Sequence, residues 1–418
     1  MHILLFIFYA FLLSWILLRR PFFKDLRPGL LIAFFLLRVG IGCLHTLIAY
    51  KYYPQHGDIW RFFHDSFTTR HDLSMGLSYF WSRNSYLVHA VYWPHNIIEW
   101  THILFNFLSF DNLYINTLFF SFLTLGGHIA LFRVFYEKFG RDALCGICVL
   151  LLPSVLFWTS CIHTEGIIYS MLGWLFYGVH RGLTKGWNAG RILQAILLTG
   201  LIILLRPAFA AGLLPALAIW LAGEMHMRRV TFFASLGVLI LLIVGLDRYK
   251  PDVLNSIPRA LSARQQEYQL LEGNSRIPLP ALQPTWNSLR DIVPDALYNG
   301  FFQPLPGVGG QKIYLAFSLE LMVMGLVIGF SFIIFVTNGV RGHQPYPSFH
   351  YPRFFASASL LLAFLGILLV GCIIPFVGAI VRYRSVFLPL LLPPYLATLH
   401  DYPVYRSLNN KLIRYIFK

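Results

Sequence analysis

Residues 29–65 read GLLIAFFLLRVGIGCLHTLIAYKYYPQHGDIWRFFHD, an apolar run followed by an aromatic and polar stretch. The run from Gly29 to Tyr50 is long enough to cross the roughly 30 Å hydrocarbon core of a bilayer as one helix. Beyond it, Asp58 follows Gly57 directly and precedes several aromatic side chains. This order predicts a membrane-spanning helix that leads into the first sizeable loop of a polytopic protein, with Asp58 at the membrane surface.

The composition of the chain supports this interpretation. Of its 418 residues, 57% are hydrophobic, 17% are aromatic and 12% are charged, whereas soluble domains carry about 25% charged residues. The net charge is +15, but the basic residues are scattered between apolar runs, so nucleic acid is not an expected partner. Retention of basic loops on the cytoplasmic side and contact with anionic membrane lipid explain the charge better.

Apolar runs predict an all-α, polytopic transmembrane fold with about eleven spans, between ten and twelve, in a single domain over residues 1–418. The run 1–18 is interpreted as a retained first span, because no basic segment precedes it and no small-residue cleavage site follows it. Residues 96–110 are predicted as either a half-buried helix or an additional span. The expected spans are 2–18, 29–50, 113–132, 143–160, 166–180, 192–205, 208–222, 229–246, 313–337, 354–372 and 385–399.

The distribution of Lys and Arg sets the predicted orientation. With the N-terminus outside and the C-terminus in the cytoplasm, more than half of the 33 Lys and Arg residues fall in short cytoplasmic segments, as the positive-inside rule requires. Five separated pieces of chain then lie on the outer face and could converge on one site. They are Asp58, Glu165, Arg206, the segment 247–312 and the pair Arg382 and Arg384.

Two long segments, 51–112 and 247–312, are expected as outer loops that carry amphipathic interfacial helices. The first is rich in Trp, Tyr and Phe, which favours helices lying in the plane of the interface. The second is more polar and rich in Pro, which predicts short helices and turns ordered against the membrane domain. The chain has no P-loop and no G-x-G-x-x-G motif. Cys145-x-x-Cys148 is interpreted as packing within an apolar run.

Asp58 is the first candidate for chemistry. A carboxylate beside a low-dielectric surface can act as a general base or bind a metal ion, and His56 lies two residues before it. The alternative is that Asp58 caps a helix that starts at Ile59.

Glu165 is the second candidate, with His163 beside it in a tight outer turn. Four polar groups in so short a connection exceed what a turn needs. The alternative is again capping, with Thr164 as the N-cap and Glu165 near the positive end of the helix dipole.

Arginines on the outer face oppose the usual charge bias and need a partner. Arg206 lies between two apolar runs, and Arg382 and Arg384 precede the last run. A phosphate bound in bidentate fashion would explain them, and snorkelling to lipid headgroups is the alternative. Arg38 lies near the middle of its span, where a charge is functional or paired by default.

In layout these residues resemble the GT-C superfamily of polytopic glycosyltransferases, in particular the bacterial protein mannosyltransferase and aminoarabinose transferase group. The resemblance implies that Asp58 lies at the catalytic centre as the base and that Glu165 helps to form the site. It also implies donor phosphate binding by Arg206, Arg382 and Arg384, and His56 and His163 are added as substrate-binding candidates. The matching pieces are Gly57-Asp58, Pro153-Ser154-x-x-x-Trp158-x-Ser160 with His163-x-Glu165, Arg206-Pro207, and Arg382-Tyr383-Arg384.

The function implied by the resemblance is transfer of a sugar from a polyprenyl-phosphate donor to a glycan, lipid or protein acceptor. Asp58 would deprotonate an acceptor hydroxyl, which attacks the anomeric carbon with inversion. The expected location is the outer, periplasmic face of a bacterial inner membrane. Because Asp58 has no acidic neighbour, a divalent metal ion stays open as a cofactor, with no ligands assigned.

Other functions fit parts of the same pattern. A polymerase or ligase of lipid-linked glycans would also use outer arginines and a large late loop, but does not require Asp58. A lipid or glycolipid transporter would need charge along a path through the bilayer, where only Arg38 is evident. A structural membrane subunit would make both Asp58 and Glu165 dispensable.

Overall fold

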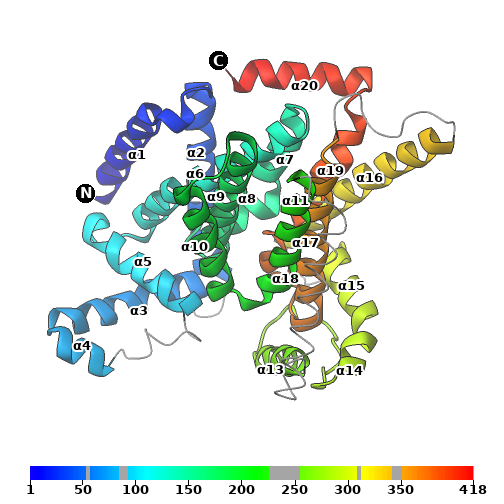
Figure 1. Cartoon of the computed structure of the whole chain (residues 1–418). Coiled ribbons are helices and arrows are strands. Elements are labelled where there is room, and N and C mark those ends of the chain that lie inside the picture. Colours follow the sequence, from blue (N-terminus) through cyan, green and yellow to red (C-terminus); the bar gives the residue numbers. More distant parts are fainter. Residues whose placement is uncertain (53–56, 84–92, 226–254, 308–311, 341–350, 418) are drawn as a thin grey trace. The chain divides into compact units, whose positions relative to one another are not determined.

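In a computed structural model, residues 1–52, 57–83, 93–225, 255–307, 312–340 and 351–417 are described. All regular elements in these residues are helices, as predicted, and the only β contacts among them are two isolated bridges (Figure 1). The chain divides into two compact units. Unit 1 comprises Met1–Pro207 with Leu399–Lys418, and unit 2 comprises Ala208–Thr398.

Six helices in the described part of the chain are long and apolar enough to cross a membrane. This supports an integral membrane protein, whereas the expected count of about eleven spans is not confirmed. The expected span 229–246 lies outside the described residues. The six are His2–Arg19, Pro28–Tyr52, Leu113–Lys138, Pro207–Glu224, Ile313–Ile334 and Arg353–Ile373.

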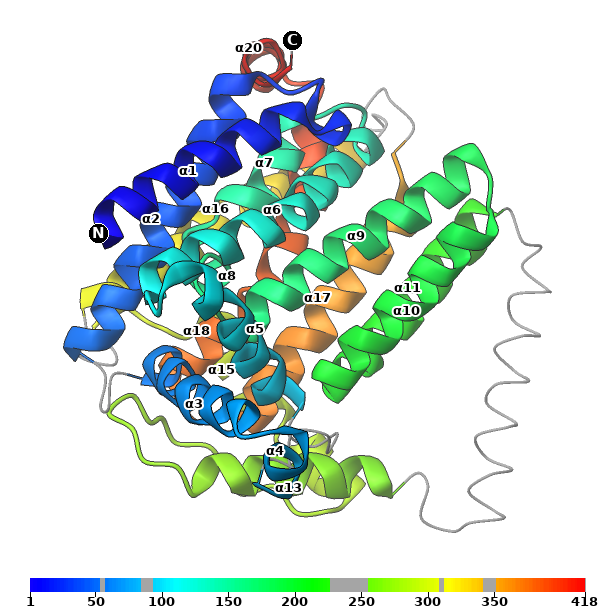
Figure 2. The same cartoon turned by 90° about the vertical axis from the view of Figure 1, so that its left-hand side faces the viewer.

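Unit 1 is organised around α6 (Leu113–Lys138), which is buried along most of its length. It packs against α2 and against α9, and α10 lies beside α9 (Figure 2). At the α6–α9 contact, Gly127 and Gly173 face each other so closely that a Cβ on either would overlap the backbone of the other helix. The helices of unit 1 are α1 (His2–Arg19), α2 (Pro28–Tyr52), α3 (Gly57–Ser74), α4 (Leu77–Arg83), α5 (Trp93–Ser109), α6, α7 (Ala143–Leu151), α8 (Pro153–Thr159), α9 (Thr164–Lys185), α10 (Ala189–Leu205) and α20 (Pro403–Ile416).

Two expected spans are not continuous helices. Residues 143–160 form α7 and α8, which are separated at Leu152. Pro153 explains the break, because proline lacks the N–H that a continuing helix needs and its ring clashes with the preceding turn. Residues 385–399 contain three prolines and form the short helices η6 (Leu388–Leu390), α19 (Leu392–Leu396) and η7 (Ala397–Leu399).

The first long segment, where it is described, contains the helices α3, α4 and α5. In α3 the buried residues recur every three or four positions, as Ile59, Phe62, Phe63 and Ser66 show, which is the spacing of one helix face. α5 has 17 residues, at the short end of the roughly 17–25 that a span takes, and is not among the six candidate spans. It buries one face and exposes Trp100, Leu104 and Phe107 among others.

Unit 2 is organised around α17 (Arg353–Ile373), which packs against α11 (Ala210–Glu224) and α15 (Val293–Phe302). The second long loop holds α13 (Ser256–Gln269), α14 (Trp286–Asp291) and α15. Gln265 ties α13 to the end of α17, because its amide donates to the carbonyl of Cys372 at 2.9 Å and its oxygen accepts from the amide of Leu282 at 2.7 Å. The other helices of unit 2 are η5 (Pro207–Phe209), α16 (Lys312–Val340), α18 (Val377–Arg384), η6 and α19.

The segment 403–417 returns to unit 1 (Figure 1). The side chain of Asn409 in α20 accepts a hydrogen bond from the amide of Ala143 at 2.8 Å. The amide of Arg27 donates to the carbonyl of Ile416 at 2.8 Å, and its side chain donates to that of Phe417 at 3.1 Å. These contacts provide hydrogen-bond partners for the backbone amide of Ala143 at the start of α7 and for Arg27 just before α2.

Candidate functional site

The turn between α8 and α9 is held by two neighbouring helices of unit 1. From α2, the guanidinium of Arg38 donates to the carbonyl of Thr159 at 2.8 Å. From α6, the hydroxyl of Ser121 donates to the carbonyl of Ser160 at 3.0 Å. Gly42 allows α2 to approach, because a Cβ there would lie 2.5 Å from the Ser160 carbonyl oxygen. Residues 160–163 are therefore fixed against the helices before any ligand binds.

Glu165 lies in the first turn of α9 and is almost fully buried, with a side-chain exposure of 1%. Its carboxylate pairs with the guanidinium of Arg206, which ends α10, at 2.6 Å. The structure thus brings together two predicted site residues that lie far apart in the sequence. The N-cap of α9 is His163 rather than Thr164, so the predicted cap was wrong by one residue.

His163 belongs to a second group in the same turn. Together with Cys161 and with His45 of α2, it places one potential ligand atom per residue within 4.8 Å of the other two, and all three side chains are buried. The sequence interpretation missed His45 and Cys161, because one looked like part of a span and the other like core packing. Two features of the sequence could have indicated this group. One is a His inside an apolar run, and the other is a Cys-x-His pair in a tight turn.

Asp58 has a different environment. The helix α3 begins at Gly57, so Asp58 lies in its first turn and is not the N-cap of a helix starting at Ile59. Its side chain is 41% exposed and lies 3.4 Å from the guanidinium of Arg61, one turn further along α3. The carboxylate is therefore accessible from outside the protein. His56 lies outside the described residues.

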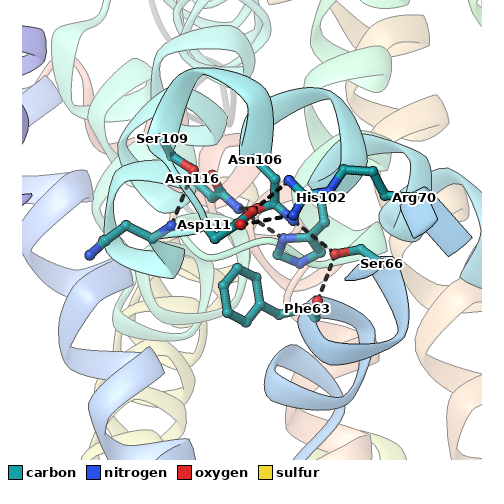
Figure 3. Close-up of polar contacts among 9 residues, drawn as sticks. Phe63, Ser66, Arg70, His102, Asn106, Ser109, Asp111 and Asn116 are labelled. Atoms are coloured by element: carbon teal, nitrogen blue, oxygen red, sulfur yellow. Dashed lines mark hydrogen bonds and ion pairs between the residues drawn. The ribbon is translucent and has the colours of Figure 1, made fainter. Parts of the chain in front are cut away.

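A polar network anchors the helix that carries Asp58 (Figure 3). The amide of Asn116 in α6 donates to Asn106 of α5 at 2.6 Å and lies 3.3 Å from His102 Nδ1. Asn106 in turn donates to the hydroxyl of Ser66 at 2.9 Å, and Ser66 donates to the carbonyl of Phe63 at 2.6 Å. Burial lowers the pKa of His102 to about 3, so its imidazole is neutral at physiological pH.

A shallow hollow of about 440 Å³ lies beside this network, between α3 and α5. The guanidinium of Arg70 lies within it, 5.6 Å from the ring of Phe67 and 5.8 Å from that of Phe107. Arg70 also forms a bidentate pair with Asp111, at 2.6 and 2.8 Å (Figure 3). Aromatic walls around a charged group can accommodate both the apolar and the polar parts of an amphipathic molecule.

Arg38 is fully buried in α2. Its Nη2 donates to the hydroxyl of Thr124 and to the carbonyl of Thr159, both at 2.8 Å. His128 contacts the same two threonines, at 2.9 Å each. No ion pair between described residues involves Arg38, so this intramembrane charge is held by hydrogen bonds that join α2, α6 and α8.

The two late arginines differ in role. Arg384 is 1% exposed and donates to the carbonyls of Gly300 and Gln303 at 2.7 and 2.6 Å. Burial lowers its pKa to about 10, which keeps it charged at neutral pH. Arg382 is half-buried and its guanidinium lies 5.3 Å from the centre of the Tyr383 ring. Both belong to unit 2, where Arg384 joins α18 to α15.

No protein-family model, curated protein or solved structure matches the chain.

Proposed function

We propose that the protein is a membrane glycosyltransferase that takes its sugar from a polyprenyl-phosphate donor on the outer face of the membrane, with Asp58 as the general base. The observation that carries the proposal is the contrast between two carboxylates of unit 1. Glu165 is 1% exposed and pairs with Arg206, whereas the side chain of Asp58 is 41% exposed and lies 3.4 Å from the guanidinium of Arg61. Only an accessible carboxylate can take a proton from an acceptor that arrives from outside.

In the proposed reaction, the carboxylate of Asp58 removes the proton of an acceptor hydroxyl as its oxygen attacks the anomeric carbon. The bond between that carbon and the phosphate oxygen breaks, and its electron pair leaves with the polyprenyl phosphate. The leaving group is already anionic, so positive charge is needed more than a proton. Arg384 of unit 2 is committed to backbone carbonyls and does not supply this charge.

The placement of charge within unit 1 supports the outer location. Within unit 1, Glu165 at the start of α9 pairs with Arg206 at the end of α10. The basic residues Arg133, Arg181 and Lys185 lie at the other ends of α6 and α9, which the positive-inside rule assigns to the cytoplasm. Labelling of a Gly186→Cys variant from the outside would contradict this orientation.

The test uses the full-length protein in nanodiscs with polyprenyl-phosphate mannose and polyprenyl-phosphate glucose as donors and a membrane lipid extract as acceptor. Release of polyprenyl phosphate is measured, because every acceptor gives this product. Asp58→Asn should lower the rate by a factor of about 10² to 10⁴. The matched control is Asp65→Asn, an exposed carboxylate on the same helix, which should keep the parent rate. Equal rates for both variants would reject Asp58 as the base, and donor translocation without release would indicate a transporter.

A further inference from the structure

Three metal-ligating side chains of unit 1 converge in the interior beside the Glu165 turn. His45 comes from α2, and Cys161 and His163 come from the turn between α8 and α9. Their potential ligand atoms all lie within 4.8 Å of one another, and the three residues are 1%, 0% and 3% exposed. Two segments that are more than a hundred residues apart thus contribute two imidazoles and one thiol to the same point.

The separations suit a shared metal ion. Zinc binds imidazole nitrogen at about 2.0–2.1 Å and thiolate sulfur at about 2.3 Å in a tetrahedron, so its ligand atoms lie roughly 3.3–3.8 Å apart. Nδ1 of His45 lies 3.0 Å from the carbonyl oxygen of Phe157, a hydrogen bond that a metal at this nitrogen would replace. The sulfur of Cys161 lies 3.2 Å from the same Nδ1, and the other separations are at most 4.8 Å. These values bracket the tetrahedral separation, so small adjustments of the side chains would complete the geometry.

The ligand types select the metal. Thiolate sulfur with two imidazoles is typical of zinc, whereas carboxylate and carbonyl oxygens are preferred by magnesium and calcium. We propose that His45, Cys161 and His163 bind a zinc ion, with the fourth position left for water or another ligand. Binding converts the thiol of Cys161 to a thiolate, and the released proton goes to solvent.

The surroundings orient the ligands in advance. The ring of His45 stacks on Phe157 with centres 4.0 Å apart and an interplanar angle of 13°. Trp158 packs edge-on against His45 at 4.8 Å and lies 5.8 Å from the ring of His163. Packing that restricts a ligating ring lowers the cost of ordering it on metal binding. If no metal binds, the same residues form a thiol–imidazole contact in a packed core. The metal measurements below distinguish these two cases.

The proposed ion would link α2 to the start of α9. His163 is the N-cap of α9, and Glu165 follows in its first turn. A metal bound to His45 and His163 would therefore fix the position of the Glu165–Arg206 pair relative to α2. The inference does not depend on glycosyl transfer, because metal content is measured without any substrate.

The first measurement is the metal content of the full-length protein, purified in detergent with a tag that contains no histidine and dialysed against micromolar zinc. About one tightly bound zinc per chain is expected, because the three residues offer one site. Cys161→Ser and His163→Gln should lower the zinc content at least about tenfold. Cys43→Ser and Cys148→Ser are the matched controls, since both cysteines are half-buried and lie outside the group, and they should retain the zinc.

The second measurement keeps the test decisive if a variant fails to fold. The parent protein is loaded with Co²⁺ in place of zinc, and its absorption spectrum should show thiolate-to-cobalt charge transfer and tetrahedral ligand-field bands. Three outcomes would overturn the proposal. These are less than about a tenth of a zinc per chain, equal zinc in the parent and folded Cys161→Ser, and a cobalt spectrum without a thiolate contribution.

Discussion

Glu165 and Asp58 are both carboxylates in the first turn of a helix in unit 1, but their environments differ. Glu165 pairs across two helices with Arg206 at 2.6 Å and is 1% exposed. Asp58 pairs within its own helix with Arg61 at 3.4 Å and is 41% exposed. The helix dipole favours both charges, so the difference comes from burial and from the origin of the partner. Glu165 lies at the buried start of α9, whereas Asp58 lies on an accessible helix surface.

The largest effect on stability should come from the buried pair. Glu165→Gln leaves Arg206 facing a neutral partner in a partly buried site, and removal of one partner of a buried pair costs about 3–5 kcal/mol. We expect about 3 kcal/mol, since Arg206 keeps 19% exposure. Thermal unfolding in detergent is the measurement. The double variant Glu165→Gln with Arg206→Met should lose less than the sum of the single losses, and simple additivity would show that the pair is not coupled.

A smaller effect should come from the close approach that positions the turn. Gly42→Ala places a methyl group 2.5 Å from the Ser160 carbonyl oxygen and 2.6 Å from Thr117 Cγ2, and overpacking of this kind costs about 1–3 kcal/mol. Gly40→Ala is the control on the same helix, because nothing lies within 4 Å of its Cβ position. It should be neutral or slightly stabilising, since alanine favours helix. Equal melting temperatures for the two variants would mean that α2 does not pack closely against the turn at Gly42.

The anchor of the Asp58 helix should respond to acid. The pKa of His102 is about 3 in the folded protein because of burial, compared with about 6.5 in an unfolded chain. The unfolded state therefore binds more protons between these values, and folded stability decreases as the pH falls through this window. From pH 6 to pH 5 the loss is about 1 kcal/mol. Hydrogen exchange of residues 98–116 measures it, and His102→Gln should remove the dependence.

Burial also raises the pKa of Glu99 in the same helix, where Thr69 donates to its carboxylate. Glu99 acts in the opposite direction to His102, because at low pH the folded state binds the extra proton. Its contribution therefore raises the stability of the folded state as the pH falls toward the acidic end of the window. An unchanged protection factor in the parent protein between pH 6 and pH 5, after correction for the slower intrinsic exchange at lower pH, would show that His102 does not control the anchor.

The smallest effect should come from the exposed pair. Arg61→Gln removes the partner of Asp58 in α3, and exposed pairs one turn apart in a helix contribute about 0.3–0.5 kcal/mol. The change in unfolding midpoint should therefore be close to the error of the measurement. A loss comparable to that of Glu165→Gln would erase the distinction between the two carboxylates.

Local patterns explain which features could be predicted from the sequence. The apolar runs of α2 and α6 depend on nearby residues, and both helices are present in the structure. The break at Pro153 was not predicted, because a hydropathy window averages over a single proline. The pairing of Glu165 with Arg206 depends on how α9 and α10 pack, which spacing along the chain does not encode. For the same reason His45 and Cys161 looked like ordinary members of apolar segments.

The contacts of α20 have a consequence for how the protein is made. The amide of Ala143 at the start of α7 is served by Asn409, and Arg27 donates to Ile416 and Phe417. These partners leave the ribosome only after all of unit 2 has been synthesised. The order of synthesis therefore differs from the order in which the two units can be completed. Unit 1 begins first, yet its last hydrogen bonds can form only after the whole of unit 2 has been synthesised.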